Sequence, residues 1–149
     1  MMSKPSNDAK NAEQKLYSMR EVCKRTGFPY ETLKFYCNKG LVPNLKRSEG
    51  NYRLFDENDI GWIESLKCLR RCGMSIEEMQ RYKDLCMQGR KSIPEHRKIL
   101  AEKLENLRKE QEKIQASIDF ILWKNNLYND IESGKVPYKS FLLKNPDKE

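Results

Sequence analysis

The sequence predicts a mainly helical protein: a small winged helix-turn-helix domain followed by a long helix that pairs with a partner. Three observations lead to this fold class. Two short helix signals flank a tight turn in residues 18–40. A basic, turn-rich segment then ends at Gly50–Phe55 and predicts a β-hairpin wing. Apolar residues finally recur in heptads from Leu100 to Ile121, which is typical of a coiled coil.

The composition suits exposed helices better than one large core. Of the 149 residues, 38% are hydrophobic and 34% are charged, so much of the apolar burial should come from a partner. No apolar run is long enough to span a bilayer, and we expect no membrane association. Five cysteines without a secretory signal indicate reduced thiols in a cytoplasm. We therefore expect a cytoplasmic, nucleoid-associated protein. Its expected parts are a disordered tail (1–15), a DNA-binding domain (16–91), a coiled-coil dimerisation helix (92–130) and a C-terminal tail (131–149).

Capping residues divide the first half of the chain into helices. Ser18 and Glu21 form a capping box that starts the first helix, and Gly27 should end it. Pro29 fits the first turn of the second helix, which we expect to stop at Gly40. In the second helix, Leu33, Phe35 and Cys37 are predicted to be core residues. Cys23 in the first helix is also predicted to be a core residue.

The wing and the next two helices follow in order. Residues 41–55 contain Pro43, Gly50 and Asn51 between short apolar pieces, so we expect a two-stranded hairpin. Asp56 and Asp59 then open a third helix that should run to Gly73. The box Ser75-Ile76-Glu77-Glu78 opens a fourth helix, which should end near Gly89 and in which Cys86 is a packing residue.

The longest helix is predicted from about residue 93 to residue 129, opened by the box Ser92-Ile93-Pro94-Glu95. At about 1.5 Å per residue it would be about 55 Å long. Its seam residues are Leu100, Leu104, Leu107, Gln111, Ile114, Ile118 and Ile121. The seam residues are alternately four and three positions apart, so they form a narrow apolar stripe along the helix. The small helices cannot cover this stripe, which favours a homodimer. The alternative is a helix folded back on its own domain. Heptads leave open whether two strands run parallel or antiparallel.

The last stretch, residues 133–149, contains Gly134, Pro137 and Pro146 and predicts no regular structure. It carries an apolar group made of Val136, Tyr138, Phe141, Leu142 and Leu143. Two readings stand: the group docks on a partner subunit, or it is an exposed apolar tail.

Positive charge is concentrated in the helix-turn-helix and the wing. Residues 18–55 contain eight basic and three acidic residues, and so carry five of the seven net positive charges. This is the footprint of a phosphate-binding surface, so we expect double-stranded DNA as a partner. No nucleophile–base pair or phosphate-cradling glycine loop is present, and we expect neither enzymatic activity nor catalytic residues.

These motifs, in this order and spacing, resemble the mercury-resistance regulator (MerR) family over about residues 16–129. The motifs are Tyr17–Val22, Thr26–Gly27, Thr32–Tyr36, Gly40–Pro43, Asn51–Phe55, Asp59–Ile60 and Gly73–Glu78. The resemblance implies a dimer with winged heads joined by an antiparallel coiled coil. It also implies binding to promoters whose −35 and −10 elements are too far apart. Such a dimer bends and untwists the spacer, so RNA polymerase is an indirect partner.

The resemblance and the exposed positions together suggest which residues contact DNA. The candidates are Ser18, Arg20, Thr32, Lys34, Tyr36, Arg47, Tyr52 and Arg53. The family usually has Arg where this chain has Lys34, which keeps a phosphate contact but loses the guanidinium fork. Phe28 stands where a capping Ser is common, which weakens the cap of the second helix. For Tyr36, core packing is an equal alternative to DNA contact.

The sensor is the least determined part of the sequence. His96 is the only histidine and no cysteine follows Cys86, so we expect no metal site and no cofactor. Cys68, in the third helix, resembles the matching cysteine of the small aldehyde- and electrophile-responsive (AdhR/NmlR-like) subgroup. Arg71 would favour its thiolate and Glu64 would oppose it. The alternative is a cysteine that only packs. Cys72, one turn later, is a second thiol or a helix-packing residue.

The leading hypothesis is a dimeric transcription regulator that is switched when an electrophile modifies Cys68. One alternative keeps the DNA-binding regulator but gives it a noncovalent ligand or no effector. Another is an architectural DNA-binding protein or a coiled-coil adaptor.

Overall fold

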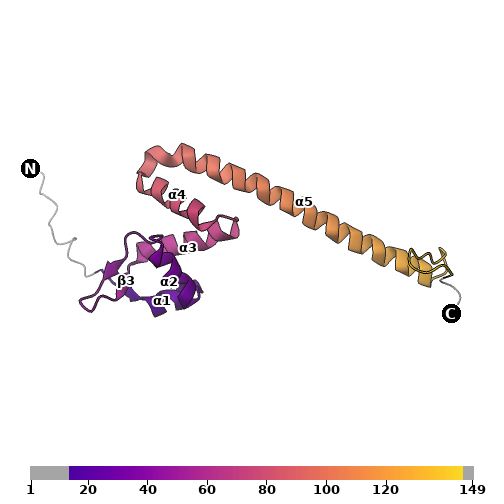
Figure 1. The fold of residues 1–149 in the computed structure, drawn as a ribbon, viewed down its shortest axis with the longest axis horizontal. Coiled ribbons are helices and arrows are strands. Elements are labelled where there is room, and N and C mark those ends of the chain that lie inside the picture. The colour runs from indigo at the N-terminus through magenta and orange to yellow at the C-terminus, as the bar shows by residue number, and fades with distance from the viewer. Residues whose placement is uncertain (1–13, 146–149) are drawn as a thin grey trace, which may run out of the picture. The chain divides into compact units, whose positions relative to one another are not determined.

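The computed structural model describes residues 14–145 and divides them into two compact units, one ending at Lys103 and the other beginning at Leu104. The predicted tail of residues 1–15 therefore lies almost wholly outside the described residues, as do residues 146–149. The elements follow the predicted order (Figure 1). They are β1 Tyr17–Ser18, α1 Met19–Thr26, α2 Tyr30–Asn38, β2 Lys46–Arg47, β3 Arg53–Phe55, α3 Glu57–Arg71, α4 Ile76–Met87, the 3₁₀ helix η2 Gly89–Ser92 and α5 Ile93–Glu132.

The wing is part of a three-stranded antiparallel sheet, not of a lone hairpin. The strand order is β1-β3-β2, with Tyr17 paired to Phe55 and Lys46 paired to Leu54. The sequence predicted β2 and β3 but missed β1. A two-residue strand is too short to show a period, and its hydrogen-bonding partner is distant in the sequence. The sheet holds the wing to the residue before α1.

The predicted caps at α1 and α3 are confirmed. The Ser18 hydroxyl accepts from the Glu21 amide at 3.2 Å, and the Glu21 carboxylate accepts from the Ser18 amide at 3.1 Å. Asp56 and Asp59 make the same reciprocal pair at 2.8 and 2.9 Å. α1 ends where expected, because Gly27 adopts a left-handed φ of 77° and donates its N–H to Cys23.

The predicted capping role of Ser92 is wrong. Ser92 ends η2, and its hydroxyl donates toward the carbonyl oxygens of Leu85 (2.5 Å) and Gly89 (2.7 Å). It also lies 3.0 Å from Nε2 of His96, whose ring is 4.9 Å from that of Tyr82. Ser92 therefore links the end of α4 to the start of α5. The two helices are connected through η2. Only the tertiary packing of that junction distinguishes this role from a cap.

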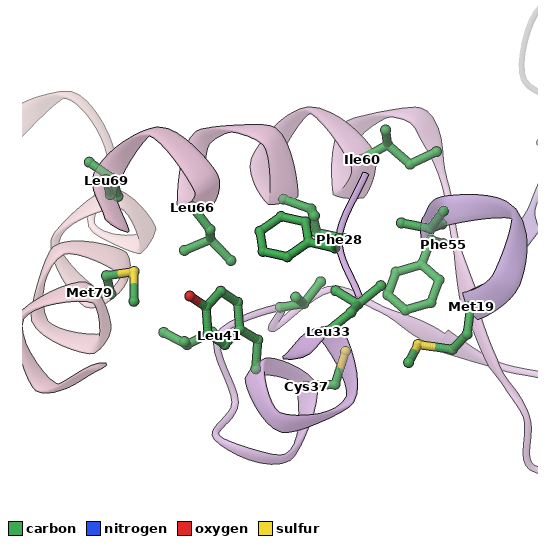
Figure 2. Close-up of a cluster of buried hydrophobic side chains, with 14 of the residues drawn as sticks. Met19, Phe28, Leu33, Cys37, Leu41, Phe55, Ile60, Leu66, Leu69 and Met79 are labelled. Carbon is green, nitrogen blue, oxygen red and sulfur yellow. The ribbon is translucent and has the colours of Figure 1, made fainter. Parts of the chain in front are cut away.

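The core of the first unit lies between α1, α2 and α3. Leu33, Phe55, Ile63 and Leu66 are fully buried. Figure 2 shows Phe28 between α3 and the Leu33 side of α2. Phe28 is only 6% exposed, so this residue, which the sequence reading treated as a weakened cap, is an apolar core residue.

One face of α2 is core, and this corrects the prediction for Phe35. Leu33, Tyr36 and Cys37 are buried at positions i, i+3 and i+4. Phe35 is 44% exposed because its position turns it away from that face. Leu33 and Cys37 are confirmed as core residues, and Cys23 packs against the same core while half-buried.

The second unit contains most of α5 and the segment after it. α5 has no buried residue over its 40 residues. It ends at a turn in which Gly134 has a φ of 78° and Lys135 donates to the carbonyl of Asp130 at 2.9 Å. Residues 133–145 form no helix or strand, as predicted. Among residues 14–145, none of the helices combines the length and apolar composition needed to cross a membrane.

Candidate nucleic-acid interface

The second helix of the helix-turn-helix presents polar and aromatic side chains to solvent. Lys34 is exposed, Thr32 is half-buried, and Tyr30 is 46% exposed in the first turn. Pro29 supplies no side-chain cap, so the first amides of α2 have no capping side chain. Free amides at a helix start favour an anion such as a DNA phosphate. Tyr30 was not among the sequence candidates, although its place beside Pro29 could have indicated it.

Tyr36 does not belong to this exposed surface, so its selection as a DNA contact is corrected. Its side chain is only 3% exposed, and its ring packs edge-on against Phe28 at 5.6 Å between centroids. The sequence left core packing and DNA contact equally open. Burial on the Leu33 face of α2 favours core packing.

The wing is a compact turn with exposed basic and aromatic residues. Asn51 has a φ of 64°, and Ser48 organises the turn by donating its amide to the Tyr52 carbonyl at 2.8 Å. Arg47 is exposed and donates to the Asn51 carbonyl at 3.1 Å. Tyr52 is 75% exposed, which suits packing against a sugar-phosphate backbone.

Arg53 connects the wing to α2. Its guanidinium donates to the side-chain oxygen of Asn38, the last residue of that helix. Its buried Nε–H has no hydrogen-bond partner among residues 14–145. Arg53 therefore has donor capacity left beside an exposed basic loop, which suits a phosphate contact.

The remaining candidates lie at the start of α1. Arg20 is exposed in its first turn. Ser18 is half-buried, and its oxygen accepts the Glu21 amide while its own O–H remains available to donate. Hydrogen bonding to Ser18 holds the pKa of Glu21 below its ordinary value, so this acid remains charged. Ser18 has a clear capping role, and any contact with DNA would be additional.

Two of the eight basic residues that suggested a phosphate surface are neutralised internally. Lys46 lies 2.6 Å from Asp56 and 2.9 Å from Asp59, whose side chains are 8% and 4% exposed. The hydrogen bond from Lys46 lowers the pKa of Asp56. Arg25 forms a two-bond pair with Glu57 at 2.8 and 3.0 Å. Both cations serve the fold, and the phosphate-binding charge is smaller than composition indicates.

A second basic group, which the sequence reading missed as a DNA-binding feature, lies on α3. Lys67, Arg70 and Arg71 line a hollow of about 340 Å³ together with the turn at Gly27–Pro29. Lys67 donates to the Thr26 carbonyl and so closes the C-terminal end of α1. Within residues 14–145, Arg70 and Arg71 form no ion pair. The sequence shows the three basic residues close together in the third helix. Only the folded structure shows that they lie beside the turn at Gly27–Pro29.

Arg70 also belongs to a second hollow. This hollow, about 500 Å³, includes Thr32 of α2 and Ser75 at the start of α4. Arg70 lines both hollows, so the basic end of α3 lies next to α2 and to the turn before it; the second hollow is otherwise largely apolar and includes Glu31. The basic group at the end of α3, Lys67, Arg70 and Arg71, can bind phosphates beside the helix-turn-helix.

The five cysteines differ sharply in exposure. Cys68 is exposed, Cys37 is buried, and Cys23, Cys72 and Cys86 are intermediate; all are free thiols. Burial raises the pKa of Cys37 to about 11 and also raises the pKa values of Cys23 and Cys86. A thiol with a raised pKa forms less thiolate. Cys68 is therefore the most accessible thiol of the five.

The two charged residues near Cys68 on α3 differ in whether an opposite charge lies beside them. Glu64 lies 3.6 Å from Lys67, so its charge is partly compensated. Arg71 is exposed and has no acid within salt-bridge distance among the described residues. No cluster of three or more metal-ligating side chains occurs in residues 14–145.

Sequence comparison finds two overlapping family matches. The family described as "MerR HTH family regulatory protein" matches residues 17–85, and "MerR, DNA binding" matches residues 62–123. The HTH-type transcriptional regulator AdhR of Bacillus subtilis is 37% identical over 90 residues. That match covers 60% of this chain and 64% of AdhR. An uncharacterised HTH-type regulator of Haemophilus influenzae is 27% identical over 75% of this chain and 83% of its own.

Solved structures share the fold. HiNmlR, described as a MerR family regulator lacking the sensor domain and bound to promoter DNA, matches with a TM-score of 0.68 and 25% identity. The match covers 80% of this chain and 94% of HiNmlR. A MerR family transcriptional regulator described as putative, from Listeria monocytogenes, also has a TM-score of 0.68, at 26% identity, covering 76% of this chain and 86% of its own.

Proposed function

Because the chain belongs to the MerR family of helix-turn-helix regulatory proteins, we propose that it binds promoter DNA as a homodimer and controls transcription. It is a regulator and not an enzyme. The supporting observation is that exposed side chains of α2 are flanked by the wing, through the Arg53–Asn38 bond, and by the basic end of α3, at the turn before α2. The promoter-bound structure of HiNmlR, which shares the fold, supports the same assignment. The proposed site of action is the bacterial cytoplasm, on the nucleoid.

In the proposed complex, α2 enters the major groove and the wing follows the adjacent backbone. Thr32 and Lys34 contact the duplex from α2, and Arg20 contacts it from α1. Arg47, Tyr52 and Arg53 contact the backbone from the wing. Arg70 and Arg71 extend the phosphate contacts to the α3 side of the turn. The lysine at position 34 contributes a point charge, without the fork of an arginine.

The dimer is proposed to form through α5. Leu100, Leu104, Ile114, Ile118 and Ile121 are between 41% and 61% exposed in the single chain. Leu107 is half-buried on the same seam. An apolar stripe repeated every 3.5 residues is stabilised by a second helix. We infer an antiparallel pair, which places one DNA-binding head at each end of the paired helices.

Two heads held at a fixed separation can bind two half-sites and deform the DNA between them. We infer that the dimer untwists and bends an over-long promoter spacer, which aligns the −35 and −10 elements for RNA polymerase. The polymerase is then an indirect partner, since the alignment of the DNA is what it recognises. The deformation energy of the duplex is repaid by the contacts of both heads.

Cys68 is proposed as the switch. Its thiolate adds to the carbonyl carbon of an aldehyde, forming a C–S bond. The carbonyl electron pair moves to oxygen, which takes a proton from water and gives a hemithioacetal. The exposure of Cys68 and the uncompensated charge of Arg71 support this role. The adduct adds bulk to α3, which also carries part of the basic surface, and so changes how the heads engage DNA.

Transcription from a cognate promoter, measured in vitro with and without an aldehyde, tests the proposal. Cys68→Ser should bind the promoter with unchanged affinity but lose the aldehyde response. Cys86→Ser is the matched control, because Cys86 is a partly buried thiol with a raised pKa, and it should keep the response. An aldehyde response that survives Cys68→Ser would leave the DNA-binding regulator standing and overturn the sensor role.

The same preparation tests the alternative of an architectural protein. Affinity for the promoter should exceed affinity for random duplex by at least about a thousandfold at one salt concentration. Equal affinity for both duplexes would contradict a sequence-specific regulator.

A further inference from the structure

Two of the five free thiols lie one helical turn apart at the end of α3. Cys68 is exposed and Cys72 is intermediate in exposure. The Cys72 N–H donates to the Cys68 carbonyl at 3.1 Å, so the helical hydrogen bonding of α3 extends to both residues. Side chains four residues apart lie on the same side of a helix. The two thiols are therefore neighbours, and they are called the α3 thiol pair here.

The surface around the α3 thiol pair is open in the single chain. Among the described residues, a Cβ atom built on Gly61, two turns before Cys68, would point into open space, and the same holds for Gly73. The Ser65 hydroxyl, between Gly61 and Cys68, donates to the Gly61 carbonyl at 3.1 Å and so turns toward the backbone. A small reagent can therefore approach both sulfur atoms of the pair.

The charges around the pair favour thiolates there more than at the other cysteines. Burial raises the pKa of Cys37 to about 11 and also raises the pKa values of Cys23 and Cys86. Arg71 lies between the two thiols of the pair in the sequence and forms no ion pair within residues 14–145. The carbonyl end of a helix disfavours a negative charge, and this cation offsets that effect.

The spacing of the pair determines what can link its two sulfur atoms. Cβ atoms four residues apart on a helix are about 5–6 Å from each other. A disulfide needs Cβ atoms about 3.5–4.5 Å apart, so a direct S–S bond would distort the last turn of α3. One atom inserted between the sulfurs lengthens the link and removes this conflict. The pair is therefore better suited to a bridging atom than to a disulfide.

The bridging atom must accept two soft sulfur ligands from the protein and no more. Thiolate sulfur prefers soft partners. Within residues 14–145, the pair belongs to no group of three or more His, Cys, Asp or Glu side chains that could hold a metal ion, so a closed zinc site is not formed here. Trivalent arsenic forms three bonds, and in an organic arsonous acid one of them already goes to carbon. Two thiols then complete its bonding.

We propose that the α3 thiol pair binds the trivalent arsenic of an organic arsonous acid, R–As(OH)₂, as a bridge between Cys68 and Cys72. Each sulfur forms a bond to arsenic as one As–O bond breaks. Each leaving hydroxide takes the proton of the attacking thiol and departs as water. Arsenic stays trivalent, so the step needs no oxidant or reductant. The inference rests on Cys68 as the accessible thiol of the proposed switch and adds a second ligand to it.

Mass spectrometry of the intact, reduced chain tests the bridge with phenylarsonous acid as the probe. The unmodified protein at equimolar probe should gain a single phenylarsenic unit with loss of two waters. It should keep this unit in excess 2-mercaptoethanol and lose it to the dithiol 2,3-dimercaptopropanol. Cys68→Ser and Cys72→Ser should each weaken retention at least about a hundredfold, because the second bond to arsenic forms at high effective concentration. Cys86→Ser is the matched control and should retain the probe. Retention in Cys72→Ser equal to that of the unmodified chain would overturn the proposal.

Two double variants separate the spacing of the thiols from their number. Cys72→Ser with Glu64→Cys places the second thiol one turn before Cys68 and should restore retention. Cys72→Ser with Arg70→Cys places it two residues after Cys68, on another side of the helix, and should not restore it. Both variants keep five cysteines. Equal retention in the two would refute a bridge that depends on the one-turn spacing.

The aldehyde response distinguishes this proposal from the proposed switch. Hemithioacetal formation needs one thiol, so Cys72→Ser should keep the transcriptional response to aldehyde while losing the arsenical. An arsenical that is not retained by the unmodified chain would overturn the bridge and leave the aldehyde switch standing. An aldehyde response lost in Cys72→Ser as fully as in Cys68→Ser would contradict the separate roles given to the two thiols.

Discussion

The guanidinium of Arg53 in β3 is hydrogen-bonded to the side-chain oxygen of Asn38 at the end of α2. This bond links the wing to the helix expected to enter the major groove. The segment between the two elements contains β2 and the buried residues Leu41 and Val42, and the Arg53–Asn38 bond adds a direct tie across it. This hydrogen bond helps to fix the distance between α2 and the wing, which must fit the groove and the adjacent backbone of one duplex.

Replacing Arg53 by Ala should weaken promoter binding and reduce its dependence on salt. Loss of one phosphate contact lowers the slope of log K against log salt concentration by about one. Fluorescence anisotropy at several salt concentrations measures that slope. Asn38→Ala should leave the slope unchanged while lowering affinity, because it removes the positioning bond and keeps the charge. Lys109→Ala, on an exposed part of α5, is the control and should match the unmodified protein.

Arg70→Ala with Arg71→Ala tests the basic surface at the end of α3. The double variant should reduce the salt slope by up to about two and weaken specific and random duplexes alike. Circular dichroism checks that α3 is intact, since both side chains are exposed. A slope equal to that of the unmodified protein would remove these arginines from the interface.

Tyr36 should behave as a core residue. Tyr36→Phe keeps the ring that packs against Phe28 and should leave promoter affinity within about twofold. Tyr36→Ala should lower the free energy of unfolding by about 3–5 kcal/mol, because it removes a buried aromatic ring. Urea titration and anisotropy measure the two quantities separately. A large loss of affinity in a fully stable Tyr36→Phe protein would restore the DNA-contact reading.

The ion pair of Lys46 with Asp56 and Asp59 should make the domain sensitive to acid. The folded state lowers the pKa of Asp56 through the hydrogen bond from Lys46. A lowered carboxyl pKa adds stability above the unfolded value, and this stability is lost as pH falls through the folded value. The unmodified protein should therefore lose free energy of unfolding as pH falls below the ordinary carboxyl pKa of about 4.

Lys46→Met should lower the free energy of unfolding by about 1–3 kcal/mol near neutral pH, because it leaves buried carboxylates without their cation. Its stability should then change less with acid than that of the unmodified protein. Lys98→Met removes an exposed pair with Glu95 and should change stability by less than about 1 kcal/mol. Parallel acid profiles for the Lys46 variant and the unmodified protein would contradict this account.

Local chemistry determined most of the fold. The caps at Ser18 and Asp56, the stop at Gly27 and the heptads of α5 each act within a few residues, so the sequence shows them directly. The same is true of the basic character of residues 18–55 and of the exposed positions Lys34 and Tyr52. These features were sufficient to predict a winged helix-turn-helix with a long helix after it.

The tertiary structure decided which of several similar residues are buried and which are exposed. It placed Tyr36 in the core and Phe35 in solvent, and it made Ser92 a tie between helices instead of a cap. It used Lys46 inside the fold, added β1 to the wing, and brought Arg70 and Arg71 to the helix-turn-helix turn. Each of these outcomes depends on a contact between residues distant in the sequence. Periodicity and capping rules describe only neighbours, so they determined where the elements lie, whereas packing determined which side chains remain free to act.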